Sequence, residues 1–409
     1  MPGVVVIGGG VAGLTSAIAL SRQGWEVTVL EREAGAPPDD VDTAFSRWPR
    51  RGVPQARHSH AFLARLRNLL RDRAPDVLAS LLDNGVTELR FTEHPPPEID
   101  DPSPRPGDGD LVALACRRTT FDWVLRRSAL ASAGVRLLQG AVVEGLLGAP
   151  AAGDQPARVT GVRARVSPGT APGGAGQVEL PAALVVDASG RTSRVASWLA
   201  QLGSPGGSEE SEDCGILYSS RFYRLVDGVD PPPQDGPIGG DLGYMKYAVF
   251  PGDNRTFSVT FGLPTGDAAM RPLLQPAPFQ AAASALPVTG PWVDPATAVP
   301  ITDVAAMTRL RSRMRRLVVD AIPVATGVVA VGDAAVHTNP LYGRGCSLAV
   351  VHAFAVADVA AACDPASEAA AIAFDRVITT ELEAWYRVSV AQDLQERAAS
   401  RNAGSSRKR

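Results

Sequence analysis

The 409-residue sequence is poor in lysine, has no closely spaced cysteines and carries no excess of either charge. Only two of its 40 basic residues, Lys246 and Lys408, are lysines, and the formal net charge is −3 with a pI near 6.0. A balanced chain lacks the basic surface that nucleic-acid binding needs, so we expect no nucleic-acid partner. The four cysteines form no C-x-x-C pair. This disfavours a disulfide framework or structural zinc and favours a cytoplasmic location.

The sequence also lacks the pattern of a signal peptide or a membrane span. The uncharged run at residues 4–20 follows no basic segment and is interrupted by Gly8, Gly9, Gly10 and Gly13. A membrane span needs about 20 continuous apolar residues and rarely contains so many glycines. We therefore expect no membrane span. A content of 45% hydrophobic and 20% charged residues is typical of a globular chain with one large domain or two.

A glycine-rich turn between a strand and a helix is the strongest signal that is present. Residues 4–7 are a continuous β-branched run, as in a strand buried on both faces. After it, Gly8, Gly10 and Gly13 match G-x-G-x-x-G, in which the glycines allow a tight turn, the approach of a pyrophosphate and close helix packing. Glu31 closes the next strand, where an acidic residue binds a ribose hydroxyl. The segment predicts a dinucleotide site at a helix N-terminus.

Two later segments also place an acidic residue at the end of a buried strand. Asp187 begins the run Asp-Ala-Ser-Gly-Arg, and Asp333 follows Gly332. The second segment continues into a turn before a helix that contains Pro340, Gly343, Gly345 and Cys346. An acid at a strand end can accept hydrogen bonds from a sugar-like chain, and a helix N-terminus stabilises negative charge on a flavin ring. These segments favour FAD over NAD as the bound dinucleotide.

In this order, the motifs resemble those of the FAD-dependent monooxygenase superfamily that includes para-hydroxybenzoate hydroxylase and squalene epoxidase. The resemblance spans about residues 4–360. It implies an α/β fold: a Rossmann-type FAD-binding domain with an inserted β-rich substrate domain and C-terminal helices. We expect the FAD-binding domain at residues 1–204 and 301–362, the substrate domain at 205–300, and a helical segment and tail at 363–409.

The resemblance also implies which residues bind FAD. Glu31 would hold the adenosine ribose, Asp333 the ribityl chain, and the turn at residues 343–346 the flavin pyrimidine. Arg118 matches the arginine that contacts FAD beyond the glycine loop, and Val143 the strand whose backbone meets the adenine. The expected cofactor residues are Gly8, Gly10, Ala12, Gly13, Glu31, Arg32, Gln55, His58, Arg118, Val143, Asp187, Gly332, Asp333, Pro340, Gly343, Gly345 and Cys346.

One motif departs from the hydroxylase pattern. The hydroxylases usually have Asp-Gly in the middle motif, with the acid serving both FAD and nicotinamide contacts. This sequence instead has Asp187-Ala188-Ser189-Gly190, which resembles the epoxidase and geranylgeranyl-reductase branches. We expect NADH or NADPH as the electron source, and the motif leaves open whether the electrons arrive directly or through a separate flavin reductase.

His58 and His60 form an H-x-H pair, whose rings on a strand would point to one side. No Asp, Glu or Cys at a suitable spacing completes a ligand set nearby, so we expect no metal. The resemblance instead places this loop over the flavin, with Gln55, Arg57 and His58 contacting the cofactor. Capping of a helix by Ser59 is the alternative.

The remaining site predictions concern catalysis and substrate. His337 follows the second acidic segment and is the one candidate for a catalytic proton-handling group, with packing as the alternative role. In a strand at residues 244–250, period two places Tyr247 and Val249 on one face. Together with Tyr244, we expect these side chains to line the substrate pocket, while ordinary sheet core is the alternative.

With the resemblance, these residues predict a flavin monooxygenase. Reduced FAD would react with dioxygen to a C4a-hydroperoxide, from which one oxygen atom enters an apolar or aromatic small-molecule substrate by hydroxylation or epoxidation. The alternatives are an alkene reductase of the geranylgeranyl-reductase type, a flavin-dependent halogenase and a non-catalytic FAD-binding protein. A halogenase is disfavoured because the sequence has no W-x-W-x-I-P segment and neither lysine is well placed.

Overall fold

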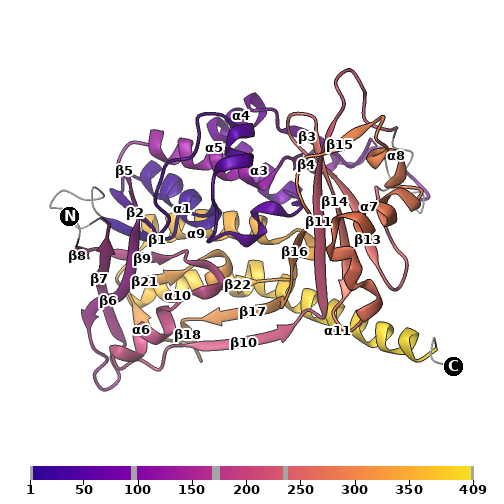
Figure 1. Ribbon diagram of the computed structural model, residues 1–409. Coiled ribbons are helices and arrows are strands. Elements are labelled where there is room, and N and C mark those ends of the chain that lie inside the picture. Colours follow the sequence, from indigo (N-terminus) through magenta and orange to yellow (C-terminus); the bar gives the residue numbers. More distant parts are fainter. Residues whose placement is uncertain (1–2, 94–98, 168–175, 234–237, 407–409) are drawn as a thin grey trace.

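The computed structural model describes residues 3–93, 99–167, 176–233 and 238–406 (Figure 1). Its central element is a parallel sheet of five strands in the order β21-β9-β1-β2-β5. These strands are β1 (Val4–Ile7), β2 (Val27–Glu31), β5 (Val135–Gln139), β9 (Leu184–Asp187) and β21 (Val328–Ala330). Residues 168–175 of a Gly/Pro-rich hairpin tip that the sequence predicts, and the last three residues of the predicted tail, lie outside the described residues.

The side chains of β1 alternate between two hydrophobic cores. Val4 and Val6 pack into the core under the helices, and Val5 and Ile7 into the core of a second sheet, which is mostly antiparallel. Because both faces of the strand are covered, its residues are continuously apolar rather than alternating. The helices are α1 (Val11–Arg22), α5 (Arg118–Ala131) and α9 (Gly345–Ala362), and the second sheet contains β6 (Ala141–Ala149), β7 (Ala157–Val166), β8 (Gly176–Pro181) and β20 (Ala325–Thr326).

Helix α9 is apolar along its 18 residues. Among the described residues it is the one helix long and apolar enough to cross a membrane, but 67% of it is buried inside the protein. It packs against α1 in the main core. Core packing therefore accounts for its composition.

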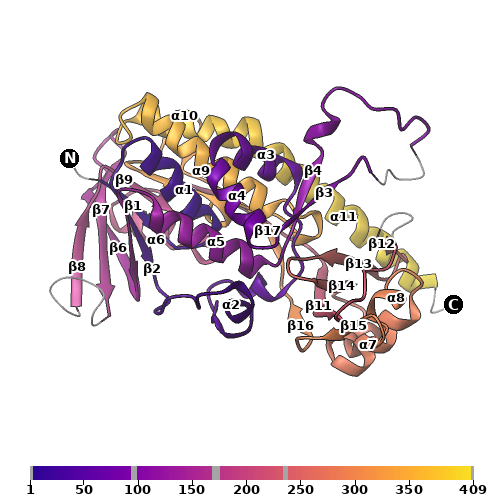
Figure 2. The same ribbon diagram turned by 90° about the horizontal axis from the view of Figure 1, so that it is seen from above.

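A larger antiparallel sheet lies beside the parallel sheet and the helices that cover it (Figure 2). Helices α7 (Pro276–Ala285) and α8 (Gly290–Val293) cover one face of it, where Phe279 packs on Phe261 and Trp292 on Phe257. The sheet contains β11 (Ile216–Leu225), β12 (Gly239–Asp241), β13 (Lys246–Pro251), β14 (Thr256–Pro264), β15 (Ala298–Pro300) and β16 (Ala305–Met307). Because β16 also pairs with β11, the sheet extends past the domain boundary expected at residue 300. The division into domains stays a prediction.

Two long strands connect the two parts of the molecule. The sequence indicates residues 203–213 only as a Gly/Ser/Glu-rich boundary, but the structure places strand β10 (Ser208–Asp213) there, paired with β17 (Arg311–Arg316). Glu209 lies opposite Arg315 and accepts a hydrogen bond of 2.6 Å from its Nε. Cross-strand pairs of opposite charge explain why a segment without β-branched residues forms a strand. The short β22 (Val336–His337) pairs with the other edge of β17.

The C-terminal helices are α10 (Glu368–Val377), a π-helical turn (Ile378–Leu382) and α11 (Glu383–Ser406). In both ribbon views α11 ends beside the larger antiparallel sheet. The other helices and strands outside the sheets above are α2 (Val41–Arg47), α3 (Ala64–Arg73), α4 (Pro75–Asp83), α6 (Val195–Gln201), β3 (Thr87–Arg90), β4 (Val112–Ala115), β18 (Val318–Val319) and β19 (Ile322–Pro323). The predicted fold class is confirmed: an α/β molecule with a Rossmann-type sheet, an additional antiparallel domain and C-terminal helices.

Candidate functional site

A cavity of about 630 Å³ follows the carboxyl ends of the parallel strands and continues to the larger antiparallel sheet. One end is lined by the glycine turn after β1 and by the end of β2, and the other by residues of β11, β13 and β14. The carboxyl edge of a parallel sheet is where ligands bind in this class of fold. The cavity therefore joins the predicted cofactor residues to the predicted substrate domain.

The glycine turn leaves room at one position and none at another. A Cβ on Gly13 would lie 1.9 Å from the carbonyl oxygen of Gly8, so α1 packs against the end of β1 only because residue 13 is glycine. A Cβ on Gly10 would meet nothing within 4 Å. Gly10 therefore borders open space at the N-terminus of α1, where unpaired backbone N–H groups attract anions.

Glu31 is held at the glycine turn by two backbone groups. Its Oε2 accepts from the N–H of Gly9 and its Oε1 from the N–H of Glu33, each at 2.9 Å. The carboxylate is buried and lines the cavity. Each oxygen retains a lone pair that can accept from a sugar hydroxyl.

A buried cluster of two arginines and one carboxylate lies next to this turn. Nε of Arg118 donates to Oδ1 of Asp122 at 2.7 Å, and Nη2 of Arg50 lies 3.3 Å from Oδ2. Burial raises the pKa of Asp122, but the charges of the two arginines outweigh it and hold that pKa below its usual range. Nε of Arg50 has no partner among the described residues. Sequence reasoning missed Arg50 because it lies in a loop, 72 positions from Asp122.

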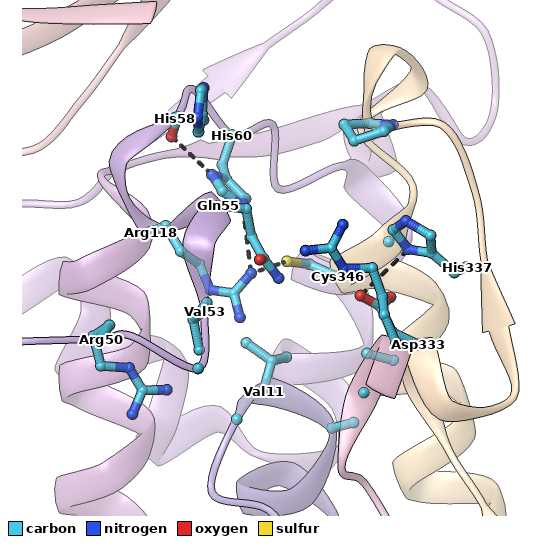
Figure 3. A pocket seen from close by; sticks show the side chains of 18 of the residues that line it. Val11, Arg50, Val53, Gln55, His58, His60, Arg118, Asp333, His337 and Cys346 are labelled. Atoms are coloured by element: carbon cyan, nitrogen blue, oxygen red, sulfur yellow. Dashed lines mark hydrogen bonds and ion pairs between the residues drawn. The ribbon is translucent and has the colours of Figure 1, made fainter. Parts of the chain in front are cut away.

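His58 and His60 both line the cavity and form hydrogen bonds there (Figure 3). Nδ1 of His60 donates to the carbonyl of His58 at 3.0 Å, and its Nε2 accepts from Nη1 of Arg118 at 3.3 Å. Burial lowers the pKa of His58 to about 4, and burial with the charge of Arg118 lowers that of His60 to about 3. Nδ1 of His58 lies 3.0 Å from Oγ of Ser220.

Ser59, considered above as a helix cap, does not cap a helix. Helix α3 begins at Ala64, and Oγ of Ser59 forms hydrogen bonds with the hydroxyls of Ser258 and Thr260 on β14. A contact 199 positions away in the chain thus replaces the local one. Among the described residues, no group of three or more His, Cys, Asp or Glu is arranged to hold a metal ion.

Asp333 and His337 form a pair at the far side of the parallel sheet. Oδ2 of Asp333 lies 3.3 Å from Nδ1 of His337, and Nε2 of His337 has no partner in the described part of the chain. Burial raises the pKa of Asp333, but His337 and Arg118 outweigh burial and lower it overall. Helix α9 fixes the turn before Asp333, because the N–H of Gly332 donates to Nδ1 of the buried His352 at 2.9 Å.

All predicted cofactor residues line the cavity except Gly13, Gly332 and Asp187. Asp187, which we expect to contact the cofactor, does not line the cavity, and its carboxylate is fully buried. It accepts from the N–H and hydroxyl of Ser189 and from the hydroxyl of Ser193, and burial raises its pKa. The two serines of its own motif thus supply the hydrogen bonds that the carboxylate of Asp187 needs. Ala188, Ser189 and Gly190 line the cavity instead of Asp187.

The substrate wall also differs from the prediction. Tyr247 lines the cavity, but Val249 lies in the core of the sheet and Tyr244 packs against the same core. The residues of β13 that line the cavity are Lys246, Tyr247, Ala248 and Phe250. The physical reason is that α7 and α8 cover the face that carries Val249, so the opposite face, with Lys246, Ala248 and Phe250, meets the cavity. Tyr247 lies on the Val249 face and contacts both the core and the cavity.

Lys246 lies at the site, although the sequence analysis expected neither lysine to be well placed for a halogenase. It lines the cavity, and its Nζ pairs with Asp241 and with Oε1 of Glu396, the latter at 3.2 Å. Burial lowers the pKa of Lys246, but the two carboxylates outweigh burial and raise it. The ammonium group is charged and engaged by two acids.

Comparisons with known proteins give a family model, a relative by sequence and solved structures with a similar fold. A family model described as FAD dependent oxidoreductase matches residues 3–99. Protein Rv3254 of Mycobacterium tuberculosis is 31% identical in an alignment 372 positions long, which covers 85% of this chain and 71% of that protein. PqsL, a probable FAD-dependent monooxygenase from Pseudomonas aeruginosa, superposes with a TM-score of 0.67 at 15% identity, over 98% of each chain. The myxobacterial chondrochloren halogenase CndH has a TM-score of 0.67 at 20% identity, over 95% of this chain and 82% of its own. At these identities the two structures establish a shared fold.

Proposed function

The chain belongs to the FAD-dependent oxidoreductases, and we propose that it is a monooxygenase that inserts one oxygen atom into an apolar or aromatic small molecule. One observation carries the proposal. A single cavity joins the dinucleotide-type edge of the parallel sheet to a wall that contains Tyr247, Ala248 and Phe250. Because the family is one of enzymes, we do not retain the alternative that the chain is a non-catalytic FAD-binding protein.

The residues present fit FAD. The open space at Gly10, the α1 N-terminus and the unpartnered Nε of Arg50 suit a pyrophosphate. Glu31 would hold the adenosine ribose and Asp333 the ribityl chain, while the turn that ends in Gly343 would face the ring. When bound and reduced, FAD supplies the activation of dioxygen, which side chains cannot provide.

The chain's own contribution is to exclude water and to place the substrate. Apolar side chains line the substrate end, including Ala248, Phe250, Met307 and Leu341. A dry site protects reactive oxygen species from loss to water.

His337 is our candidate for the group that holds or moves a proton. Because the carboxylate of Asp333 can only accept, Nδ1 of His337 carries the proton and Nε2 keeps a lone pair without a partner among the described residues. An Asp-oriented imidazole of this kind can act as a general base.

We propose that NADH or NADPH delivers the electrons, mainly through a separate flavin reductase. Support comes from Asp187, since an acid that is consumed by Ser189 and Ser193 is not presented to a nicotinamide. A cytoplasmic location is part of the proposal and is supported by the four cysteines, which are all unpaired thiols.

A halogenase is the second candidate, because Lys246 lines the cavity and CndH shares the fold. The paired state of its ammonium group argues against a free reactive amine. Halide dependence of the product separates this candidate from the first.

The test is oxygen consumption by the FAD-loaded protein with NADH or NADPH, with and without a flavin reductase, followed by product mass. A monooxygenase adds one oxygen atom, an alkene reductase two hydrogens and a halogenase one halogen. We expect slow flavin reduction by NADPH alone. Protein that cannot be loaded with FAD would contradict the entire proposal.

A further inference from the structure

A buried hydrogen-bond network connects the C-terminal helix α11 to the substrate end of the cavity. Its centre is Asp393, which is 2% exposed. Oδ1 of Asp393 accepts from Nδ2 of Asn339 at 2.7 Å and from the hydroxyl of Tyr342 at 3.1 Å, and Oδ2 accepts from the hydroxyl of Ser312 at 3.5 Å. Three donors from two separate segments, residues 339–342 and strand β17, thus converge on one carboxylate.

The network continues from Asn339 to the antiparallel sheet. Oδ1 of Asn339 accepts from the hydroxyl of Tyr218 on β11 at 2.6 Å and from the N–H of Leu341 at 3.0 Å. Because Oδ1 of Asp393 acts as an acceptor, the amide of Asn339 must turn its Nδ2 toward Asp393 and its Oδ1 toward Tyr218. The hydroxyl proton of Tyr218 is therefore committed to Asn339.

Both tyrosines line the cavity, Tyr218 from β11 and Tyr342 from the turn Pro340–Tyr342. Their hydroxyl protons are both used inside the network, so these groups do not donate to a substrate. Burial raises the pKa of each phenol, which keeps both protonated at neutral pH. The cavity wall therefore presents two aromatic rings rather than two hydroxyl donors.

One turn further along α11, Glu396 pairs with Lys246 and so engages the cation that lines the same cavity. Asp393 engages the hydroxyl of Tyr342 directly and that of Tyr218 through Asn339, and Glu396 engages the ammonium group of Lys246. A buried carboxylate carries a desolvation cost that an apolar residue would avoid. The three hydrogen bonds that Asp393 accepts offset this cost and explain why a carboxylate occupies the position.

We propose that Asp393 is a positioning residue that sets the cavity's preference for apolar aromatic substrates over hydroxylated ones, by holding Asn339 and Tyr342 in the network. This inference rests on the proposed function, because it describes the substrate class of the same site. It assigns the C-terminal helix a part in substrate selection that no single motif indicates.

The test compares two probes of the same ring size, naphthalene and 2-naphthol, on the FAD-loaded protein. Binding is read from the change in the visible absorption of the bound flavin. We expect the natural protein to bind naphthalene at least as tightly as 2-naphthol. Asp393→Leu frees the hydroxyl of Tyr342 and the amide of Asn339, so the preference should move toward 2-naphthol by about fivefold or more, the effect of one hydrogen bond.

Two further variants separate positioning from a general loss of structure. Asp393→Asn keeps the Oδ1 acceptor and should restore the natural preference. In Asp393→Leu combined with Tyr342→Phe, the released hydroxyl is absent, so much of the shift should disappear. Gln395→Ala, at an exposed position of the same helix, is the matched control and should leave the preference unchanged.

If Asp393→Leu fails to fold, Asp393→Ala releases the same donors without added bulk. Natural preference in the folded Leu or Ala variant would overturn the inference while leaving the proposed function intact. Binding of neither probe by the FAD-loaded natural protein would instead contradict the proposed function, and this inference with it.

Discussion

Arg117 and Asp253 form a fully buried ion pair that joins the antiparallel sheet to helix α5. Asp253 lies in the turn between β13 and β14, and its Oδ1 accepts from the backbone N–H of Arg117 at 2.7 Å, while Thr120 donates to Oδ2 at 2.8 Å. The carboxylate therefore serves both a buried guanidinium and the N-terminus of a helix. The next residue, Arg118, lines the cavity, so this pair sets the position of the sheet relative to the site.

Asp253→Ala should destabilise the protein by about 3–5 kcal/mol, because it leaves the charge of Arg117 buried without its main partner. Urea unfolding followed by fluorescence measures the loss. Asp358→Ala breaks the exposed pair with Arg73 and serves as the control, with an expected effect below about 1 kcal/mol. Equal effects of the two substitutions would contradict the assigned importance of the buried pair.

Gly10→Leu should abolish FAD binding while the protein still folds. A side chain at residue 10 has open space in the protein and would occupy the path of the pyrophosphate, so FAD could not seat at the turn. Gly13→Ala is the contrasting variant and should lower the melting temperature, since its Cβ would collide with the carbonyl of Gly8. FAD titration and thermal unfolding of both variants measure these two effects. Normal FAD affinity in Gly10→Leu would show that the glycine turn does not bind the cofactor.

Asp333→Ala should weaken FAD binding by about 1.5–3 kcal/mol, because a hydroxyl of the cofactor loses a charged acceptor. Asp333→Asn keeps an acceptor oxygen and should recover part of the loss. Fluorescence titration of the FAD-free protein measures both affinities. The placement of Asp333 at the ribityl chain is wrong if the Ala variant binds FAD normally.

Ala248→Asp should uncouple the enzyme rather than unfold it. Its carboxylate enters the cavity and draws in water, so hydrogen peroxide should rise and oxygenated product fall while FAD stays bound. Val249→Asp, one residue along the same strand, buries an unpaired charge in the sheet core and should unfold the domain. Tyr247→Asp should uncouple as well, since Tyr247 also lines the cavity. Full coupling in both Ala248→Asp and Tyr247→Asp would show that the substrate does not bind against this strand.

Stability should decrease as the pH falls below about 6.5. Burial lowers the pKa of His58 to about 4, and lowers those of His60 and His352 to about 3, whereas the unfolded chain titrates near 6.5. Between these pH values the unfolded state binds protons that the folded state does not bind. Each histidine therefore lowers the free energy of unfolding by up to about 1.4 kcal/mol for each pH unit of acidification. The contribution of these groups is fully present above the unfolded pKa.

Urea unfolding near neutral pH and at mildly acidic pH measures this dependence. His352→Asn retains an acceptor for the N–H of Gly332 and removes one titrating ring, so its stability should fall less steeply with acid. An unchanged slope would show that His352 does not contribute.

Much of the parallel sheet and of the cofactor edge is determined by residues that lie close together in the chain. A run such as Val4–Ile7 has no polar face, so it must be covered on both sides. The conformation of the glycine turn depends on its own backbone, and Glu31 and Asp333 stand at strand ends that a parallel sheet brings to one edge. These features follow from local geometry and the burial of apolar surface.

The tertiary structure decided the rest, because those contacts join distant segments or depend on what covers a face. Period two separates Ala248 from Val249, but only the packing of α7 and α8 decides which of them meets the cavity. Arg50 reaches Asp122 across 72 positions, and Asp393 reaches Asn339 across 54. A hydrogen bond requires two atoms within about 3 Å of each other, and no local pattern specifies where two remote segments will cross.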